Sequence, residues 1–247
     1  MVGLISELEN KEDSFITEFS SHGVFAKRFS KIEEIKPILL QRRFLSFEFV
    51  KTYDFLIEAL DDSDATSVAR QIVREEYPVA NGSFPSHRED LLRDLNVLSI
   101  SKEEVFSTVM TSETRRTIER NLENVFKILN DRHREVMAIA YMRFFGEVLT
   151  SIEYEMFGDM WLNRVFNFDR QRGKSYLLKS HFYYNHFKHD RKMMPLDAPD
   201  ATDGGSHSDR LAGTLVKLVN SRERLEAVVG AERLGLETKN KFYDQFF

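Results

Sequence analysis

Apolar residues recur every three to four positions through most of this chain, and that spacing limits its fold more than any other sequence feature. Strictly alternating apolar and polar runs, which would indicate strands, are rare. Only 11 glycines and 5 prolines occur in 247 residues, and the prolines stand at the edges of the periodic segments. The pattern therefore predicts an all-α fold.

A chain of this length can hold one large domain or two small ones. We find no internal repeat and no convincing linker in it. The only low-complexity segment is the loop 195–207, which we expect to be a mobile connection or a lid. We therefore predict a single compact domain over residues 1–247, a bundle of about seven to nine helices. The expected helices are 11–21, 36–60, 63–77, 86–98, 101–110, 112–130, 132–165, 171–193 and 208–246.

Composition excludes several classes of protein. The net charge of −5 argues against a nucleic-acid binder or a binder of anionic membranes, which needs a basic surface. The chain has no cysteine, so disulfides, thiolate metal sites and cysteine nucleophiles are excluded. No signal peptide, no membrane span and no common phosphate-loop, hydrolase or zinc-protease motif is found. We expect a soluble cytoplasmic protein that binds no nucleic acid and no membrane.

Helical phasing predicts which carboxylates point inward. Glu153 shares its face with apolar neighbours such as Leu149 and Phe157, so we expect it to be buried. Glu147 shares a face with Arg143, Thr150 and other polar residues, and we expect it to face solvent. A buried carboxylate has to be neutralised, paired or metal-bound. For Glu153, pairing with an arginine and binding a metal ion both remain open.

A second acidic residue has a similar setting. Glu76 follows Ile72 and Val73 on an apolar helix face, and His87 opens the next helix after a loop that can fold back toward Glu76. Ser86 precedes that helix as its N-cap. Glu76 and His87 are thus candidate metal ligands, with an arginine-paired glutamate and a capping histidine as the alternatives.

The segment SHFYYNHFKHDRKMM contains three histidines and an aspartate. His186 and Asp190 are four residues apart and share one helical face, and His189 lies at the flank of that face. His181 lies about 140° away from His186 around the helix. Carboxylates and imidazoles from four helices suit iron or manganese. The alternative is an ordinary buried hydrogen-bonded pair of His186 and Asp190.

Four segments resemble a known family. Glu76 and His87 lie in REEYPVANGSFPSHREDLLRDLNVL, Glu153 in GEVLTSIEYEMF, and His186 and Asp190 in FYYNHFKHDRKM. With the opening helices in SSHGVFAKRFSKIEEIKPILLQRRFLSFEFVKTYDFLIEAL, these segments resemble the haem-oxygenase-like superfamily. Within it they are most similar to the CADD-like branch of non-haem di-iron oxidases and oxygenases, which includes the chlamydial death-domain-associating protein. The similarity covers most of the chain.

The resemblance implies a bundle whose centre holds metal on the matching residues Glu76, His87, Glu153, His186 and Asp190. The last motif of the branch is H-x3-D-x2-H, and Met193 occupies its third place. Methionine is a poor ligand for hard iron, so one site is incomplete unless His189 or His207 substitutes.

The activity implied by the resemblance is an O₂-dependent oxidation of a small organic substrate at iron, with two ions, or at manganese. Tyr183 is a candidate for a redox or positioning role beside the metal, with plain core packing as its alternative. The resemblance thus favours a metal-dependent oxidoreductase, and a homodimer is compatible with it.

Two other functions stay open within the same superfamily. One is a metal-free oxidase similar to the PqqC-like quinone-biosynthesis enzymes. The other is a non-catalytic CADD-like binding or interaction protein with a decayed metal site, for which Met193 is the main evidence. A TenA-like thiaminase activity is excluded by the absence of a cysteine nucleophile.

Overall fold

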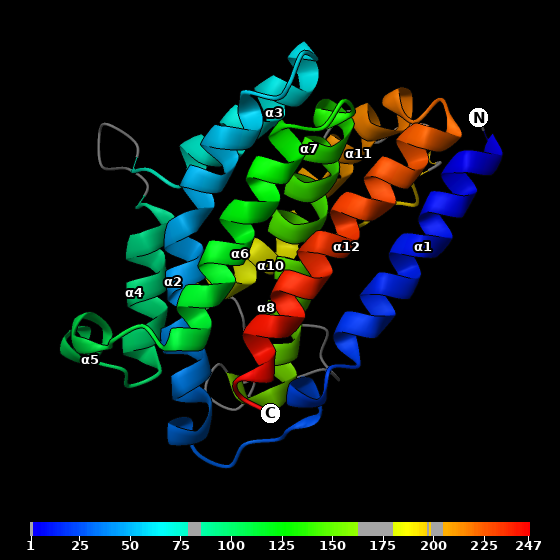
Figure 1. Ribbon diagram of the computed structural model, residues 1–247. Helices are drawn as coiled ribbons and strands as arrows, with labels where there is room; N and C mark the ends of the chain where they lie inside the picture. The colour runs from blue at the N-terminus through cyan, green and yellow to red at the C-terminus, as the bar shows by residue number, and fades with distance from the viewer. Residues whose placement is uncertain (1, 79–84, 163–179, 197, 199–204) are drawn as a thin grey trace.

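Helices follow one another along the described part of the chain in the computed structural model (Figure 1), which comprises residues 2–78, 85–162, 180–196, 198 and 205–247. Within these residues no strand occurs, and the predicted all-α bundle is confirmed. The helices are α1 (Val2–Ser20), η1 (Gly23–Ala26), α2 (Ile32–Ile57), α3 (Ser63–Glu75), α4 (His87–Val97), α5 (Lys102–Ser107), α6 (Ser112–Leu129), α7 (Arg134–Tyr141), η2 (Met142–Val148), α8 (Leu149–Phe157), η3 (Gly158–Leu162), α10 (Tyr183–Asp190), α11 (His207–Leu218) and α12 (Arg222–Asp244).

Side-chain caps fix several helix starts. The predicted capping box at α4 is confirmed: Ser86 Oγ accepts from the Glu89 backbone N–H, and the Glu89 carboxylate accepts from the Ser86 backbone N–H at 2.7 Å. The last helical region, predicted over 208–246, consists of two helices, because α11 ends at Leu218 and α12 begins at Arg222. Ser221 caps the second helix by accepting from the backbone N–H of Arg224.

A continuous helical rod, α7–η2–α8–η3, runs through the middle of the bundle. Helix α12 packs against α7, α6 and α1, while α10 packs against α8 and α11 against α3 and η2. Figure 1 shows α12 (orange to red) between α1 (blue) and α6 (green). The rod is therefore surrounded by other helices on several sides.

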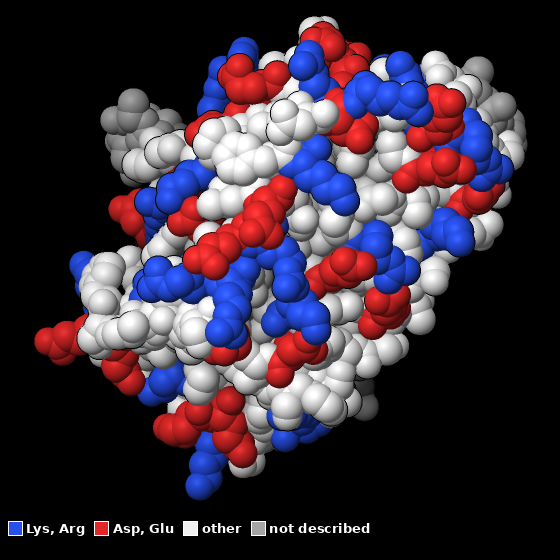
Figure 2. Space-filling view, in the orientation of Figure 1, with Lys and Arg blue, Asp and Glu red and all other residues white. Residues whose placement is uncertain are grey.

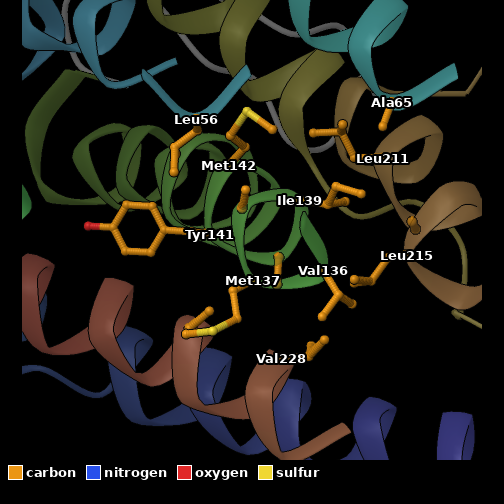
Figure 3. Packing of buried hydrophobic residues seen from close by; sticks show 14 of the residues in the cluster. Leu56, Ala65, Val136, Met137, Ile139, Tyr141, Met142, Leu211, Leu215 and Val228 are labelled. Atoms are coloured by element: carbon orange, nitrogen blue, oxygen red, sulfur yellow. The ribbon is translucent and has the colours of Figure 1, made fainter. Parts of the chain in front are cut away.

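Two groups of buried apolar residues pack against this rod. One lies around α7, where Val136, Met137 and Ile139 contact side chains of α11 and α12 such as Leu215 and Val228 (Figure 3). The other lies toward the opposite end and is rich in aromatic rings. Full burial of each large apolar side chain contributes about 1.5–3 kcal/mol, so these contacts are the main force that holds the helices together.

The segment η2 within the rod is π-helical. Its backbone bonds follow an i→i+5 pattern, so each turn holds more residues than an α-helical turn. The helix predicted over 132–165 is confirmed for residues 134–162, which are helical throughout. The assumption of α-helical spacing along its whole length is wrong, because Met142–Val148 are π-helical. Side chains in and after η2 therefore point in other directions than an α-helix would give them.

Charged side chains of both signs are intermixed on the face shown in Figure 2. Red and blue groups alternate over α2, α6 and α12 on that face without a large area of one sign. No helix in the described ranges is long and apolar enough to cross a membrane.

Candidate metal centre

A cavity lies beside the π-helical segment, between α2, α3, α8 and α10. It encloses about 850 Å³ of empty space, counted out to its open mouth. Apolar side chains such as Phe49, Met142 and Phe145 form much of its wall. The cavity is also lined by a concentration of acidic residues and histidines: Glu76, His87, Glu147, His186, His189, Asp190 and His207.

The first candidate ligand cluster consists of Glu76, His87 and His186. One ligand atom from each lies within 4.8 Å of the others. His87 Nδ1 lies 2.8 Å from Glu76 Oε1, and the rings of His87 and His186 have centroids 4.4 Å apart. The cluster joins the end of α3, the start of α4 and the middle of α10. All three residues were predicted as ligands from the sequence, and the structure brings them together.

The tautomer of His186 favours metal binding. Its Nδ1 lies 2.8 Å from the Phe182 carbonyl oxygen, which can only accept a hydrogen bond, so Nδ1 carries the proton and Nε2 has a free lone pair. Burial and the neighbouring His87 lower the pKa of His186 well below its usual value. His186 is therefore neutral, as a metal ligand must be.

The second candidate ligand cluster consists of Glu147, Asp190 and His207, all buried. His207 Nδ1 lies 3.3 Å from Glu147 Oε2 and 3.3 Å from Asp190 Oδ1. The other ring nitrogen of His207 lies 3.2 Å from Glu75 Oε2. His189 Nδ1 lies 2.5 Å from Asp190 Oδ1. The ring centroid of His189 lies 5.3 Å from that of His186 in the first cluster and 4.8 Å from that of His207 in the second, so the two clusters adjoin.

The second cluster concentrates negative charge in a buried place. Burial and the nearby Asp190 raise the pKa of Glu147 to about 7. Burial opposes a charge on His207, but hydrogen bonds to Asp190, Glu147 and Glu75 raise its pKa to about 12. A cation held among these carboxylates is thus strongly stabilised. Without another cation, the imidazolium of His207 balances part of the charge of these carboxylates.

Tyr53 of α2 orients the second cluster. Its hydroxyl donates to Glu147 Oε1 and lies 3.1 Å from the Met142 carbonyl oxygen. The ring is buried and packs on Phe49, with centroids 4.3 Å apart. Sequence reasoning did not single out Tyr53. The available signal was its position in an α2 segment that is apolar on more than one side.

The sequence predicted the surroundings of Glu153 better than those of Glu147, and both residues belong to the rod. The expected burial of Glu153 is confirmed, but Glu153 belongs to neither ligand cluster. Its Oε2 pairs with Arg42 Nη2 at 2.7 Å and with Lys239 Nζ at 2.8 Å. The expected exposure of Glu147 is wrong: only 1% of its surface is exposed. Glu147 lies within the π-helical segment, where α-helical phasing does not apply, and the rod is covered on that side too.

His207, and not Met193, lies next to Asp190 in the structure. Met193 is 53% exposed, and its backbone N–H donates to Asp209 Oδ1 at 3.1 Å. His207, the first residue of α11, contacts Asp190 instead. His181 is exposed and apart from the clusters, as phasing predicted. The expectation that 195–207 forms a lid falls largely on 197 and 199–204, which lie outside the described residues.

Tyr183 is a core residue in this structure. Its ring is buried, with centroids 5.2 Å from Tyr154 and 6.4 Å from Phe157. Burial raises the pKa of its hydroxyl well above the usual value. Tyr183 is not among the residues that line the cavity, so packing is the role that its position supports.

A network of ion pairs between α1, η2 and the segment after α10 lies next to the second cluster. Arg143 of η2 pairs with Glu12 of α1, and its Nε donates to the Ser208 carbonyl at 3.0 Å, next to His207. Lys192, two residues after Asp190, lies 2.9 Å from Glu12 Oε1 and also pairs with Glu9. Helix α1 is thereby tied to both chain segments that carry Asp190 and His207.

Comparison with known proteins identifies the fold. No protein-family model matches the chain, and no curated protein matches its sequence. A CADD-like protein of unknown function from Nostoc punctiforme has a similar structure, with a TM-score of 0.66, 12% identity, and coverage of 98% of this chain and 96% of that one. A TenA homolog from Pseudomonas syringae pv. tomato has a TM-score of 0.62 at 10% identity and covers 98% and 91%. The fold is haem-oxygenase-like. The resemblance seen in the sequence is thus confirmed for the fold, and these identities show the fold alone.

Proposed function

We propose that this protein is a non-haem oxidase or oxygenase that binds two iron ions and uses O₂ to oxidise a small organic substrate. The observation that carries the proposal is the pair of adjoining clusters, each with three nitrogen or oxygen ligands, on the wall of one cavity. This donor set suits iron and manganese. The CADD-like resemblance favours iron.

In the proposed site, Glu76, His87 and His186 hold one ion. Glu147, Asp190 and His207 hold the other, with Glu75 and His189 as neighbouring donors. His207 gives up one ring proton when it becomes a ligand, because only a ring nitrogen with a free lone pair binds metal. Bound iron would supply the electrons and the open positions that O₂ activation needs.

The chain's own residues position the ligands and exclude water. The Phe182 carbonyl holds His186 in the tautomer that exposes Nε2. The Tyr53 hydroxyl holds one oxygen of Glu147, which leaves the other for the ion. Phe49, Met142 and Phe145 keep the adjoining cavity apolar, so a reactive site there is shielded from water.

Metal counting tests the proposal. The protein is loaded anaerobically with Fe(II), passed over a desalting column and analysed for iron per chain. We expect about two ions in the wild type and about one in each of the variants Glu76→Gln and Glu147→Gln, because each variant removes a ligand from one cluster. The matched control is His181→Gln, which removes an exposed histidine from the same segment and should leave the count unchanged.

Two outcomes would contradict the proposal. A wild-type protein that stays metal-free after anaerobic loading would favour the metal-free oxidase or the non-catalytic binding protein. Iron uptake that Glu76→Gln and Glu147→Gln both leave intact would place the ions elsewhere. Oxygen consumption by the loaded protein, measured with an electrode in the presence of candidate substrates, then tests the oxidase activity itself.

A further inference from the structure

The cavity has a second polar region besides the two ligand clusters. Arg42 of α2, Thr150 of α8 and Lys239 of α12 line the same cavity, and we call these three residues the cationic patch. The side chains of Arg42 and Lys239 are only 8% and 1% exposed. Buried basic residues on a cavity wall need an explanation, because each requires a counter-charge.

The cationic patch has one carboxylate for two cations. Arg42 Nε and Nη2 lie 2.8 and 2.7 Å from Glu153 Oε2, and Lys239 Nζ lies 2.8 Å from the same oxygen. Lys239 Nζ also donates to Thr150 Oγ1 at 2.9 Å. An ammonium has three N–H donors, so these two contacts leave one for a ligand.

When Lys239 is protonated, Arg42, Lys239 and Glu153 together carry a net charge of +1. An uncompensated charge in a buried site is strongly unfavourable, so either the ammonium loses its proton or an anion binds beside it. Burial lowers the pKa of Lys239 to about 7, despite the attraction of Glu153. Because Arg42 and Lys239 share one oxygen of a single carboxylate, a monoanion bound beside Lys239 would balance the second positive charge.

The rest of the cavity limits what can carry that anion. Leu45, Phe49 and Phe145 present apolar surface between the polar regions. Thr150 lies three residues after Glu147 on the same rod, which is about 5 Å along a helix axis. A ligand held at the cationic patch therefore has its other atoms close to the second ligand cluster.

We propose that the remaining N–H donor of Lys239, beside the Arg42–Glu153 pair, binds the carboxylate of a small, otherwise apolar carboxylic acid. One unpaired positive charge matches a monocarboxylate better than a phosphate, and the apolar wall matches a hydrocarbon body. The assignment of this acid as the substrate rests on the proposed function. Binding of the carboxylate at the patch does not depend on the metal ions.

Calorimetric titration of the metal-free protein tests the proposal, with hexanoate and 3-phenylpropanoate as probes and the matching primary amides as uncharged controls. We expect the acids to bind and the amides to bind at least about tenfold more weakly, because only the acids form a charge-assisted hydrogen bond with Lys239. Lys239→Met should weaken binding of the acids by at least about tenfold. In this variant Glu153 still pairs with Arg42, so the variant should still fold.

The matched control is Lys241→Met, which removes an exposed lysine from the same helix and should not change the affinity. Thermal unfolding of each variant checks that it is folded. Arg42→Lys is a second variant that keeps the charge of the patch but loses the planar fork, and it should weaken binding of the acids less than Lys239→Met does.

The outcomes separate this proposal from the proposed function. Equal binding of acids and amides, or unchanged affinity in folded Lys239→Met, would overturn the carboxylate site. Binding of acids only after iron loading would also overturn it, because the carboxylate would then sit on the ions. Glu76→Gln should lose about one of the two ions but keep acid binding, whereas Lys239→Met should keep about two ions and lose acid binding.

Discussion

Gly146 stands where a single methyl group would disturb the second ligand cluster. A Cβ atom at this position would lie 2.7 Å from the Tyr53 hydroxyl oxygen and 3.0 Å from its Cε2. The ring has little room to move because it is buried against Phe49. Gly146→Ala should therefore push the hydroxyl away from Glu147.

The size of the effect follows from three contributions. Overpacking a filled core costs about 1–3 kcal/mol. Loss of a hydrogen bond to a charged group costs about 1.5–3 kcal/mol. Alanine regains about 1 kcal/mol over glycine through its helix propensity. We expect Gly146→Ala to lower the free energy of unfolding by about 1.5–5 kcal/mol, the balance of these contributions.

The assay is urea unfolding of the metal-free protein, followed by circular dichroism, together with iron counting. Gly230→Ala is the matched control, because a Cβ at Gly230 meets nothing within 4 Å and the residue is exposed on α12. This control should gain up to about 1 kcal/mol. Gly146→Ala should also reduce occupancy of the second ion, because Glu147 is no longer held by Tyr53.

A double variant sharpens the test. Tyr53→Phe removes the atom nearest to the new methyl group, so Gly146→Ala should cost less in the Tyr53→Phe background than in the wild type. A Gly146→Ala protein that is as stable as the wild type and keeps about two ions would refute the reasoning, since the Tyr53 ring would then move at no cost.

Two further predictions concern single residues outside the clusters. Met193→His should leave the iron count unchanged, because this exposed position does not face the site; an additional ion per chain would contradict that geometry. Burial and the nearby Glu12 raise the pKa of Glu232 well above 4.5, so between pH 4.5 and this raised pKa Glu232 is protonated in the folded protein and ionised in the unfolded chain. The contribution of Glu232 to the free energy of unfolding should thus fall as pH rises above about 4.5, by up to about 1.4 kcal/mol per pH unit, and Glu232→Gln should remove this contribution from the pH dependence measured by urea unfolding.

Helical phasing predicted those parts of the site that lie on regular α-helix or at its ends. Glu76 and His186 were predicted in this way, His87 was predicted from its place after a loop that can fold back, and the structure brings the three into one cluster. The phase argument failed at Glu147, because this residue lies in a π-helical segment that the spacing of apolar residues does not reveal, whereas the burial that it predicted for Glu153 is confirmed.

The place of His207 depends on tertiary contacts. It lies 17 residues after Asp190, and its approach to that residue depends on Arg143, which donates to the neighbouring Ser208 carbonyl. No short-range pattern in the sequence encodes such a contact. The sequence motif pointed to Met193 instead, the residue that continues α-helical spacing from His186 and Asp190, but α10 ends at Asp190.

The attachment of α1 to the segment after Asp190 has a consequence for the order of assembly. Lys192 and Glu9 are 183 positions apart, and Arg143 and Glu12 are 131 positions apart. Contacts over such separations are slow to form, because closing a long loop costs conformational entropy before the contact stabilises it. During synthesis the first helix has to wait until about four fifths of the chain has been made before Lys192 exists to meet it. We therefore expect the second ion site to form only after α1 has met the segment around Lys192, and an ion bound there would mark a chain in which these distant segments have come together.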